Sequence, residues 1–288
     1  MGIEFDPSPQ LKQYAHPNKL VTNAWLGAKL GTPGLKVVEV DADALLYDIG
    51  HIPTAVRLKW DEDLSDHVWR DLIGSREFEK LMDRLGIARD DTVVFYGDHA
   101  NLWAVYALWV FELFGHPDVR ILDGGRDAWM QEEREISYAV DEAPNQTGYS
   151  VAARRNDHTN RIFVDELRTK FEGSQLIDLR NSEEYNGDVI LPGHPIRRNG
   201  HVPGAVNLRA DSSLLANSRF RPIDHITSTH AELQLDSSRP TVVYCNNGAR
   251  AALEWFVLRF LLGWEDVRVY DGSWIEWGNM MRVPIERG

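Results

Sequence analysis

The chain has 288 residues, of which 43% are hydrophobic and 26% charged, so it is expected to form one large globular domain or two of ordinary size. Its net charge of −13 argues against nucleic-acid binding, because phosphates require a basic surface. The longest apolar stretch, residues 102–111, is too short to span a membrane, so no membrane partner is expected.

Cys245 is the only cysteine of the chain, which excludes an internal disulfide. The usual spacings of metal-binding cysteines and histidines are missing, so we expect no metal site. The N-terminal residues show neither a basic start nor an apolar core, which argues against a secretory signal. The sequence therefore predicts a cytoplasmic protein.

Short apolar runs of strand length alternate along the chain with longer stretches of helical length. The expected strands are residues 37–40, 92–96, 119–122, 176–179, 241–244 and 267–270. Residues 101–114 and 249–262 are expected to form helices that end at Gly115 and Gly263. This alternation predicts an α/β fold, with a mostly parallel sheet flanked by helices on both faces.

The chain also repeats itself. Residues 50–56 return as residues 200–206 with the same Gly-His-x-Pro start, and residues 91–129 correspond without a gap to residues 239–277. Such a repeat predicts two homologous domains. The expected organisation is a domain over residues 1–145, a polar linker over residues 146–160 and a second domain over residues 161–288.

The two copies differ in the loop that follows the strand at residues 92–96 or 241–244. Cys245 stands where the first copy has Gly97, and Arg250 stands where it has Leu102. Only the second copy has a nucleophile, so we expect the first domain to be catalytically inactive.

The loop after residues 241–244 joins a strand end to a helix start, where open α/β sheets bind ligands. Asn246, Asn247 and Gly248 tolerate left-handed backbone angles, so the loop can point its N–H groups inward and bind an anion. Such a site favours the thiolate form of Cys245. The predicted site comprises the catalytic Cys245 and the substrate-binding residues Asn246, Asn247, Gly248, Ala249 and Arg250.

Each of these residues has an alternative interpretation. Cys245 could be a small buried hydrophobe, as many lone cysteines are. Arg250 could form an ordinary ion pair, and Asn246 and Asn247 could serve only to form the turn.

The duplicated halves, the two His-x-Pro turns and the Cys245 loop resemble the tandem-domain rhodaneses, and in particular the actinobacterial thiosulfate sulfurtransferases. Residues 6–9, 14–17 and 270–279 carry the same likeness, which covers essentially the whole chain. The resemblance implies an enzyme that moves sulfur from thiosulfate to cyanide or a thiol, such as that of a thioredoxin, through a persulfide on Cys245. It implies no cofactor.

The resemblance also extends the predicted site to Arg180 and Trp274. Arg180 would help to hold the donor, with an ion pair to Asp178 or Glu184 as the alternative. Trp274 would form a wall of the pocket or pack in the core. Asn246 replaces an arginine that is usual in the resembling enzymes, so a 3-mercaptopyruvate sulfurtransferase stays open as an alternative.

Two further classes compete with a sulfurtransferase. Phosphatases of related fold place five residues between the cysteine and the arginine, whereas four separate Cys245 from Arg250, and this narrower loop suits a single sulfur better than a phosphate. A non-catalytic sulfur-relay module is the other alternative.

Overall fold

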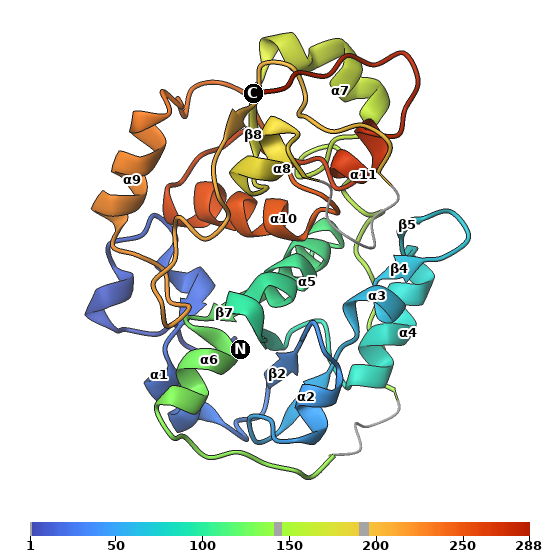
Figure 1. Ribbon diagram of the computed structural model, residues 1–288. Helices are drawn as coiled ribbons and strands as arrows, with labels where there is room; N and C mark the ends of the chain where they lie inside the picture. The colour runs from blue at the N-terminus through green and yellow to red at the C-terminus, as the bar shows by residue number, and fades with distance from the viewer. Residues whose placement is uncertain (1, 141–145, 190–195) are drawn as a thin grey trace. The chain divides into compact units, whose positions relative to one another are not determined.

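The computed structural model describes residues 2–140, 146–189 and 196–288, except for the side chain of residue 171. The chain divides into two compact units (Figure 1). The first comprises Met1–Asn156 and Leu214–Phe220, and the second comprises Asp157–Ser213 and Arg221–Gly288. The first unit therefore takes in a segment that lies beyond residues 146–160, which the sequence predicts to be a linker.

The first unit is built on a parallel sheet of five strands in the order β1-β7-β6-β2-β3. A short antiparallel pair, β4 and β5, lies outside this sheet. The strands are β1 Leu20–Val21, β2 Leu35–Glu39, β3 Ala55–Arg57, β4 Ser65–Asp66, β5 Asp71–Leu72, β6 Thr92–Tyr96 and β7 Asp118–Leu122.

Among the described residues of this unit, six α-helices connect these strands or follow them. Most residues of α5 are buried, which explains why its sequence is apolar on every side. The helices are α1 Asn23–Lys29, α2 Leu45–Asp48, α3 Trp60–Asp63, α4 Ser75–Leu85, α5 Leu102–Leu113 and α6 Gly125–Gln131; η1 Pro9–Leu11, η2 Pro17–Lys19 and η3 His99–Asn101 are short 3₁₀ turns.

The second unit repeats the central part of the first. Its four parallel strands have the order β11-β10-β8-β9, which matches β7-β6-β2-β3. A single bridge between Arg161 and Val269 stands where β1 pairs with β7 in the first unit. The strands are β8 Gln175–Asp178, β9 Val206–Asn207, β10 Thr241–Tyr244 and β11 Val267–Val269. The α/β fold class predicted from the sequence is confirmed.

The helices of the second unit include one departure from the sequence prediction. The helix expected over residues 249–262 is α-helical only to Phe256 and continues as a π-helix over Val257–Leu261. The α-helices are α7 Val164–Lys170, α8 Ser182–Asn186, α9 Ile223–Glu232, α10 Ala249–Phe256 and α11 Ser273–Trp277; η4 Phe171–Gly173 is a 3₁₀ turn.

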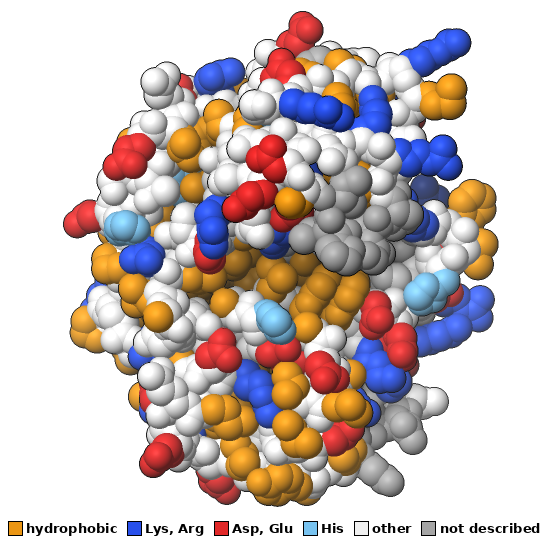
Figure 2. Space-filling view, in the orientation of Figure 1, with side chains coloured by type: hydrophobic (Ala, Val, Ile, Leu, Met, Phe, Trp, Pro, Cys, Tyr) orange, Lys and Arg blue, Asp and Glu red, His pale blue; other side chains and the backbone are white. Residues whose placement is uncertain are grey.

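The surface of the described residues carries both signs of charge. On the face drawn in Figure 2, acidic and basic side chains are interspersed. A nucleic-acid site would gather its basic side chains on one face. Within the described ranges, no helix has the length and apolar character that crossing a membrane requires.

The second unit contains a buried ion pair between α9 and α10 that generates a prediction. His230 Nε2 lies 2.6 Å from Glu254 Oε1, and both side chains are almost fully buried. Burial alone would lower the pKa of His230, but the charge and hydrogen bond of Glu254 outweigh burial, and the pKa is raised. The pair therefore stabilises the fold fully below the ordinary histidine pKa, and this stabilisation is lost as the pH rises through the raised value.

We expect the free energy of unfolding to fall between about pH 6.5 and the raised pKa of His230, and Glu254→Gln to remove this dependence. Urea denaturation over a pH series measures both. Glu232→Gln makes the same charge change at an exposed position of α9. This control should keep the wild-type dependence of the unfolding free energy on pH. Equal slopes in the wild type and in Glu254→Gln would contradict the assignment.

Candidate functional site

The cysteine of the chain lies between the end of β10 and the start of α10. Cys245 directly follows β10, and its side chain is buried. The N–H of Gly248 donates to the Cys245 sulfur over 3.2 Å. Gly248 has a φ of +94°, and a Cβ atom there would approach the Asp271 Cα to 3.2 Å, so the turn requires glycine. The loop thus curls with an N–H directed at the sulfur.

The first two residues of α11, which follows β11, form hydrogen bonds with both the N–H and the carbonyl of the cysteine. The Cys245 N–H donates to Ser273 Oγ over 3.1 Å, and the Trp274 N–H donates to the Cys245 carbonyl over 2.9 Å. Ser273 adopts a φ of +53° and is fully buried. Ser273 was not among the site residues predicted from the sequence. A comparison of the two copies could have identified Ser273, because it stands where the first copy has Gly125. Both residues have the same positive φ.

The carboxylate of Glu184, on α8, joins two residues of the cysteine loop. Its Oε1 accepts from Asn246 Nδ2 over 2.6 Å, and its two oxygens lie 3.1 and 3.4 Å from the guanidinium of Arg250. Burial would raise the pKa of Glu184, but the hydrogen bond and charge of Arg250 outweigh burial and hold it below its ordinary value. Glu184 is therefore an ionised partner of Arg250. It is not the partner of Arg180 that the sequence allowed.

Asn246 is left with an unused acceptor beside the cysteine. The side chain is 3% exposed, and its Oδ1 has no hydrogen-bond partner among the described residues. Asn247 is half-buried, and Ala249 is buried at the first position of α10. The roles of Asn246, Asn247, Ala249 and Arg250 in binding a substrate stay predictions.

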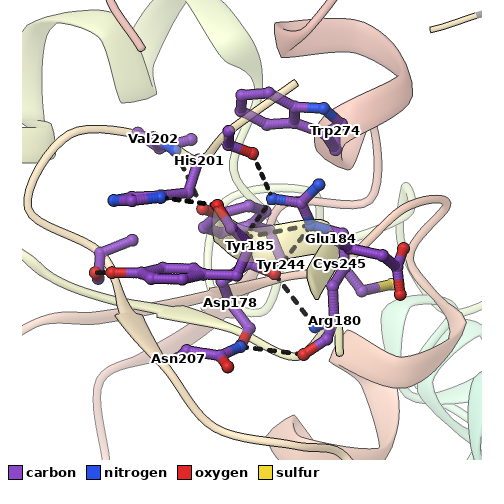
Figure 3. A network of polar contacts seen from close by, with 12 residues as sticks. Asp178, Arg180, Glu184, Tyr185, His201, Val202, Asn207, Tyr244, Cys245 and Trp274 are labelled. Carbon is purple, nitrogen blue, oxygen red and sulfur yellow. Dashed lines mark hydrogen bonds and ion pairs between the residues drawn. The ribbon is translucent and has the colours of Figure 1, made fainter. Parts of the chain in front are cut away.

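Arg180 takes part in a buried polar network at the ends of β8 and β10 (Figure 3). Its Nη2 donates to Asp178 Oδ2 over 2.6 Å and to the Gly200 carbonyl over 2.7 Å. The ring of Trp274 lies over the guanidinium, 4.5 Å from its carbon, and is itself buried. The structure thus shows the ion pair that was the alternative for Arg180, and Trp274 packs on that pair. A role of either residue in binding a donor stays a prediction.

Tyr244 connects this network to the turn that carries His201. The Val202 N–H donates to the Tyr244 hydroxyl over 3.0 Å. Burial is the main cause that raises the pKa of Tyr244 well above its ordinary value, and the charge of the Asp178 carboxylate is the second. The hydroxyl therefore stays protonated. His201 stacks on Tyr185 with ring centroids 3.7 Å apart.

The first unit builds the same network with an arginine from another element. β2 pairs Glu39 with Tyr96 as β8 pairs Asp178 with Tyr244. Arg126 from α6 donates to Glu39 over 2.7 Å and to the Gly50 carbonyl over 2.6 Å. Because Arg126 corresponds in sequence to Trp274, the two units supply the cation from different positions of the chain.

The loop of the first unit has no room for a nucleophile. A Cβ atom on Gly97 would lie 2.1 Å from the Val40 carbonyl oxygen. The Gly97 N–H donates to Asn101 Oδ1, and His99, Ala100 and Asn101 all have positive φ. This left-handed turn also explains why α5 begins at Leu102 and not at residue 101. Across the described part of the chain, no group of three metal-binding side chains is placed to hold an ion.

Comparisons with known proteins agree on the family and the fold. The model of the rhodanese-like domain matches twice, at residues 22–132 and 163–280. A thiosulfate sulfurtransferase from Corynebacterium glutamicum is 51% identical, over 100% of this chain and 97% of that protein. The sulfur carrier protein TtuD of Thermus thermophilus is 41% identical, over 96% of this chain and 99% of that protein.

A solved structure with both units is also similar. The anaerobic ergothioneine biosynthesis enzyme from Chlorobium limicola, in complex with trimethyl histidine, has a TM-score of 0.83 and 25% identity. The match covers 96% of this chain and 71% of that one.

The Asp178–Arg180 pair is expected to be essential to the second unit. Arg180→Met would leave the Asp178 carboxylate buried without its cation, and removal of one partner of a buried pair costs about 3–5 kcal/mol. Arg209→Met is a matched control, because Arg209 pairs with Asp211 at the same spacing on the surface and should change stability little. Urea denaturation compares the two, and equal losses would contradict the prediction.

Gly97 is expected to tolerate no side chain. Gly97→Ala must displace the Val40 backbone and should cost roughly 2–4 kcal/mol of unfolding free energy. Gly173→Ala is the control, because a Cβ atom there contacts nothing within 4 Å. The same denaturation measurement tests the difference, and a loss at residue 97 no larger than at residue 173 would refute the steric argument.

Proposed function

Because the chain belongs to the rhodanese family, we propose that it is a thiosulfate sulfurtransferase that carries the transferred sulfur as a persulfide on Cys245. The observation that carries the proposal is the contact from the Gly248 N–H to the Cys245 sulfur at the start of α10. A backbone N–H at a helix N-terminus stabilises negative charge, both on a thiolate and on the outer sulfur of a persulfide.

In the first half-reaction, the Cys245 thiolate attacks the outer sulfur of thiosulfate. The new bond joins Cys245 Sγ to this outer sulfur. The sulfur–sulfur bond of the donor breaks, and its electron pair leaves with sulfite. The negative charge then rests on the outer sulfur of the persulfide. This is covalent catalysis by a cysteine, and the Cys245 loop supplies the charge stabilisation.

In the second half-reaction, a nucleophilic acceptor attacks the outer sulfur and returns the Cys245 thiolate. The acceptor is a small thiophilic molecule such as cyanide, or the thiol of a protein of the thioredoxin type. We place the reaction in the cytoplasm, where reducing conditions keep thiol acceptors available.

The ion pair between Glu184 and Arg250 favours two alternative functions. Glu184 already pairs with Arg250, so the site offers a donor less positive charge than the loop sequence suggests. This favours either 3-mercaptopyruvate, as a less charged donor, or a relay module that a protein partner loads. TtuD, a relative, is named as a sulfur carrier.

The central test is the intact mass of the protein after incubation with thiosulfate. A gain of about 32 Da, removable by cyanide, is expected because one sulfur atom is added to Cys245. Cys245→Ala should abolish the gain while its melting temperature stays near that of the wild type. A gain retained in Cys245→Ala would overturn the proposal.

Separate incubation with 3-mercaptopyruvate distinguishes the donors by the rate of the same mass gain. No gain with either donor would point to the relay module.

A further inference from the structure

Cys245, Arg250 and Glu184 form a closely coupled set of charges. Burial would lower the pKa of Arg250, but the charge of Cys245 and the hydrogen bond and charge of Glu184 outweigh burial, and the pKa is raised. Both anions therefore act on one cation. Arg180 adds no free charge, because Asp178 neutralises it. When Cys245 is a thiolate, three anions face two cations, and the net charge is about −1. The anions are Cys245, Glu184 and Asp178, and the cations are Arg250 and Arg180.

The oxygens beside the loop add to this negative character. Glu184 is only 3% exposed and holds Arg250 with both of its oxygens. The Oδ1 of Asn246 is also buried and lacks a donor among the described residues. An anion that approaches Arg250 must therefore compete with a carboxylate already in place.

We propose that Glu184 is a specificity-determining residue, which disfavours doubly charged sulfur donors by occupying Arg250. The inference rests on the proposed sulfurtransferase function and deepens it. The preferred donor class carries at most one negative charge near the transferred sulfur, as an alkyl persulfide anion does, and thiosulfate is accepted with a higher KM. Glu184 acts through electrostatics and the orientation of Arg250, and it has no covalent part in the reaction.

The chemistry is the same for both donor classes. The Cys245 thiolate attacks the outer sulfur of an alkyl persulfide anion, the donor's sulfur–sulfur bond breaks, and the electron pair leaves with the thiolate of the donor. Two negative charges are present before and after this step. The corresponding step with thiosulfate brings three negative charges together, so it is the one that Glu184 opposes more strongly.

Glu184→Gln tests the inference, because it removes the charge and keeps the shape. Glutamine also serves at this position of a capping box, so α8 should keep its start at Asn181. We expect the KM for thiosulfate to fall by roughly threefold to tenfold, and kcat to change by less than about twofold. Thermal melting checks that the variant is folded.

Glu183→Gln is the matched control. Glu183 is the neighbouring residue on α8, carries the same charge and is exposed. Its substitution should leave the KM for thiosulfate near the wild-type value. A KM that is unchanged or raised in Glu184→Gln would overturn the inference, and so would a fall of kcat by tenfold. Either result would leave Glu184 as a residue that only positions Arg250.

A second readout does not depend on sulfur transfer. Cys245 is the only thiol, so its alkylation can be followed with iodoacetate, which is charged, and iodoacetamide, which is neutral. Glu184→Gln should raise the ratio of the iodoacetate rate to the iodoacetamide rate by roughly threefold to tenfold. Glu183→Gln should leave this ratio unchanged.

This ratio separates the two proposals. If the wild type forms no persulfide with thiosulfate but the alkylation ratio rises in Glu184→Gln, the proposed function fails. The inference that Glu184 disfavours anions at the site then stands. If the persulfide forms and neither the ratio nor the KM changes in Glu184→Gln, the inference about Glu184 fails alone.

Discussion

The second unit depends on one buried interaction, the pairing of Asp178 with Arg180 where the strands of the sheet end. The pair lies beneath Trp274 and beside the Tyr244 hydroxyl, which in turn accepts from the Val202 N–H. It thereby joins the end of β8, the His201 turn and the start of α11. Because Trp274 also donates to the Cys245 carbonyl, the position of the cysteine is tied to this charge pair. A charge pair without access to water must keep its geometry or lose several kcal/mol.

The two units show how a duplicated fold can conserve a contact and exchange the residues that make it. Each unit has a carboxylate opposite a tyrosine and a guanidinium bound to the glycine carbonyl of the His-x-Pro turn. In the first unit Arg126 comes from α6, and in the second Arg180 comes from the end of β8. In the second unit, Trp274 stands at the position that corresponds to Arg126. Both units thus bury a cation at this place, although different positions of the chain supply it.

Much of the fold could be predicted from the sequence, because the period of apolar residues and the repeat are both local patterns. Cys245 and Gly248 could be found because the copies differ at the cysteine and the loop needs a left-handed residue. The partner of Arg250 could not be found, because Glu184 reaches it only through the packing of α8 on the loop. The π-helical end of the helix after β10 was missed for a similar reason, since nothing in residues 257–261 distinguishes it from α-helix.

A chain with a single thiol has no internal route for returning an oxidised cysteine to its resting state. If Cys245 is oxidised to a sulfenic acid, no second cysteine of the same chain can condense with it to form a protective disulfide. Recovery then depends on a thiol from another molecule. The burial of Cys245 limits access of oxidants. The same burial that orders the nucleophile therefore also protects it between turnovers.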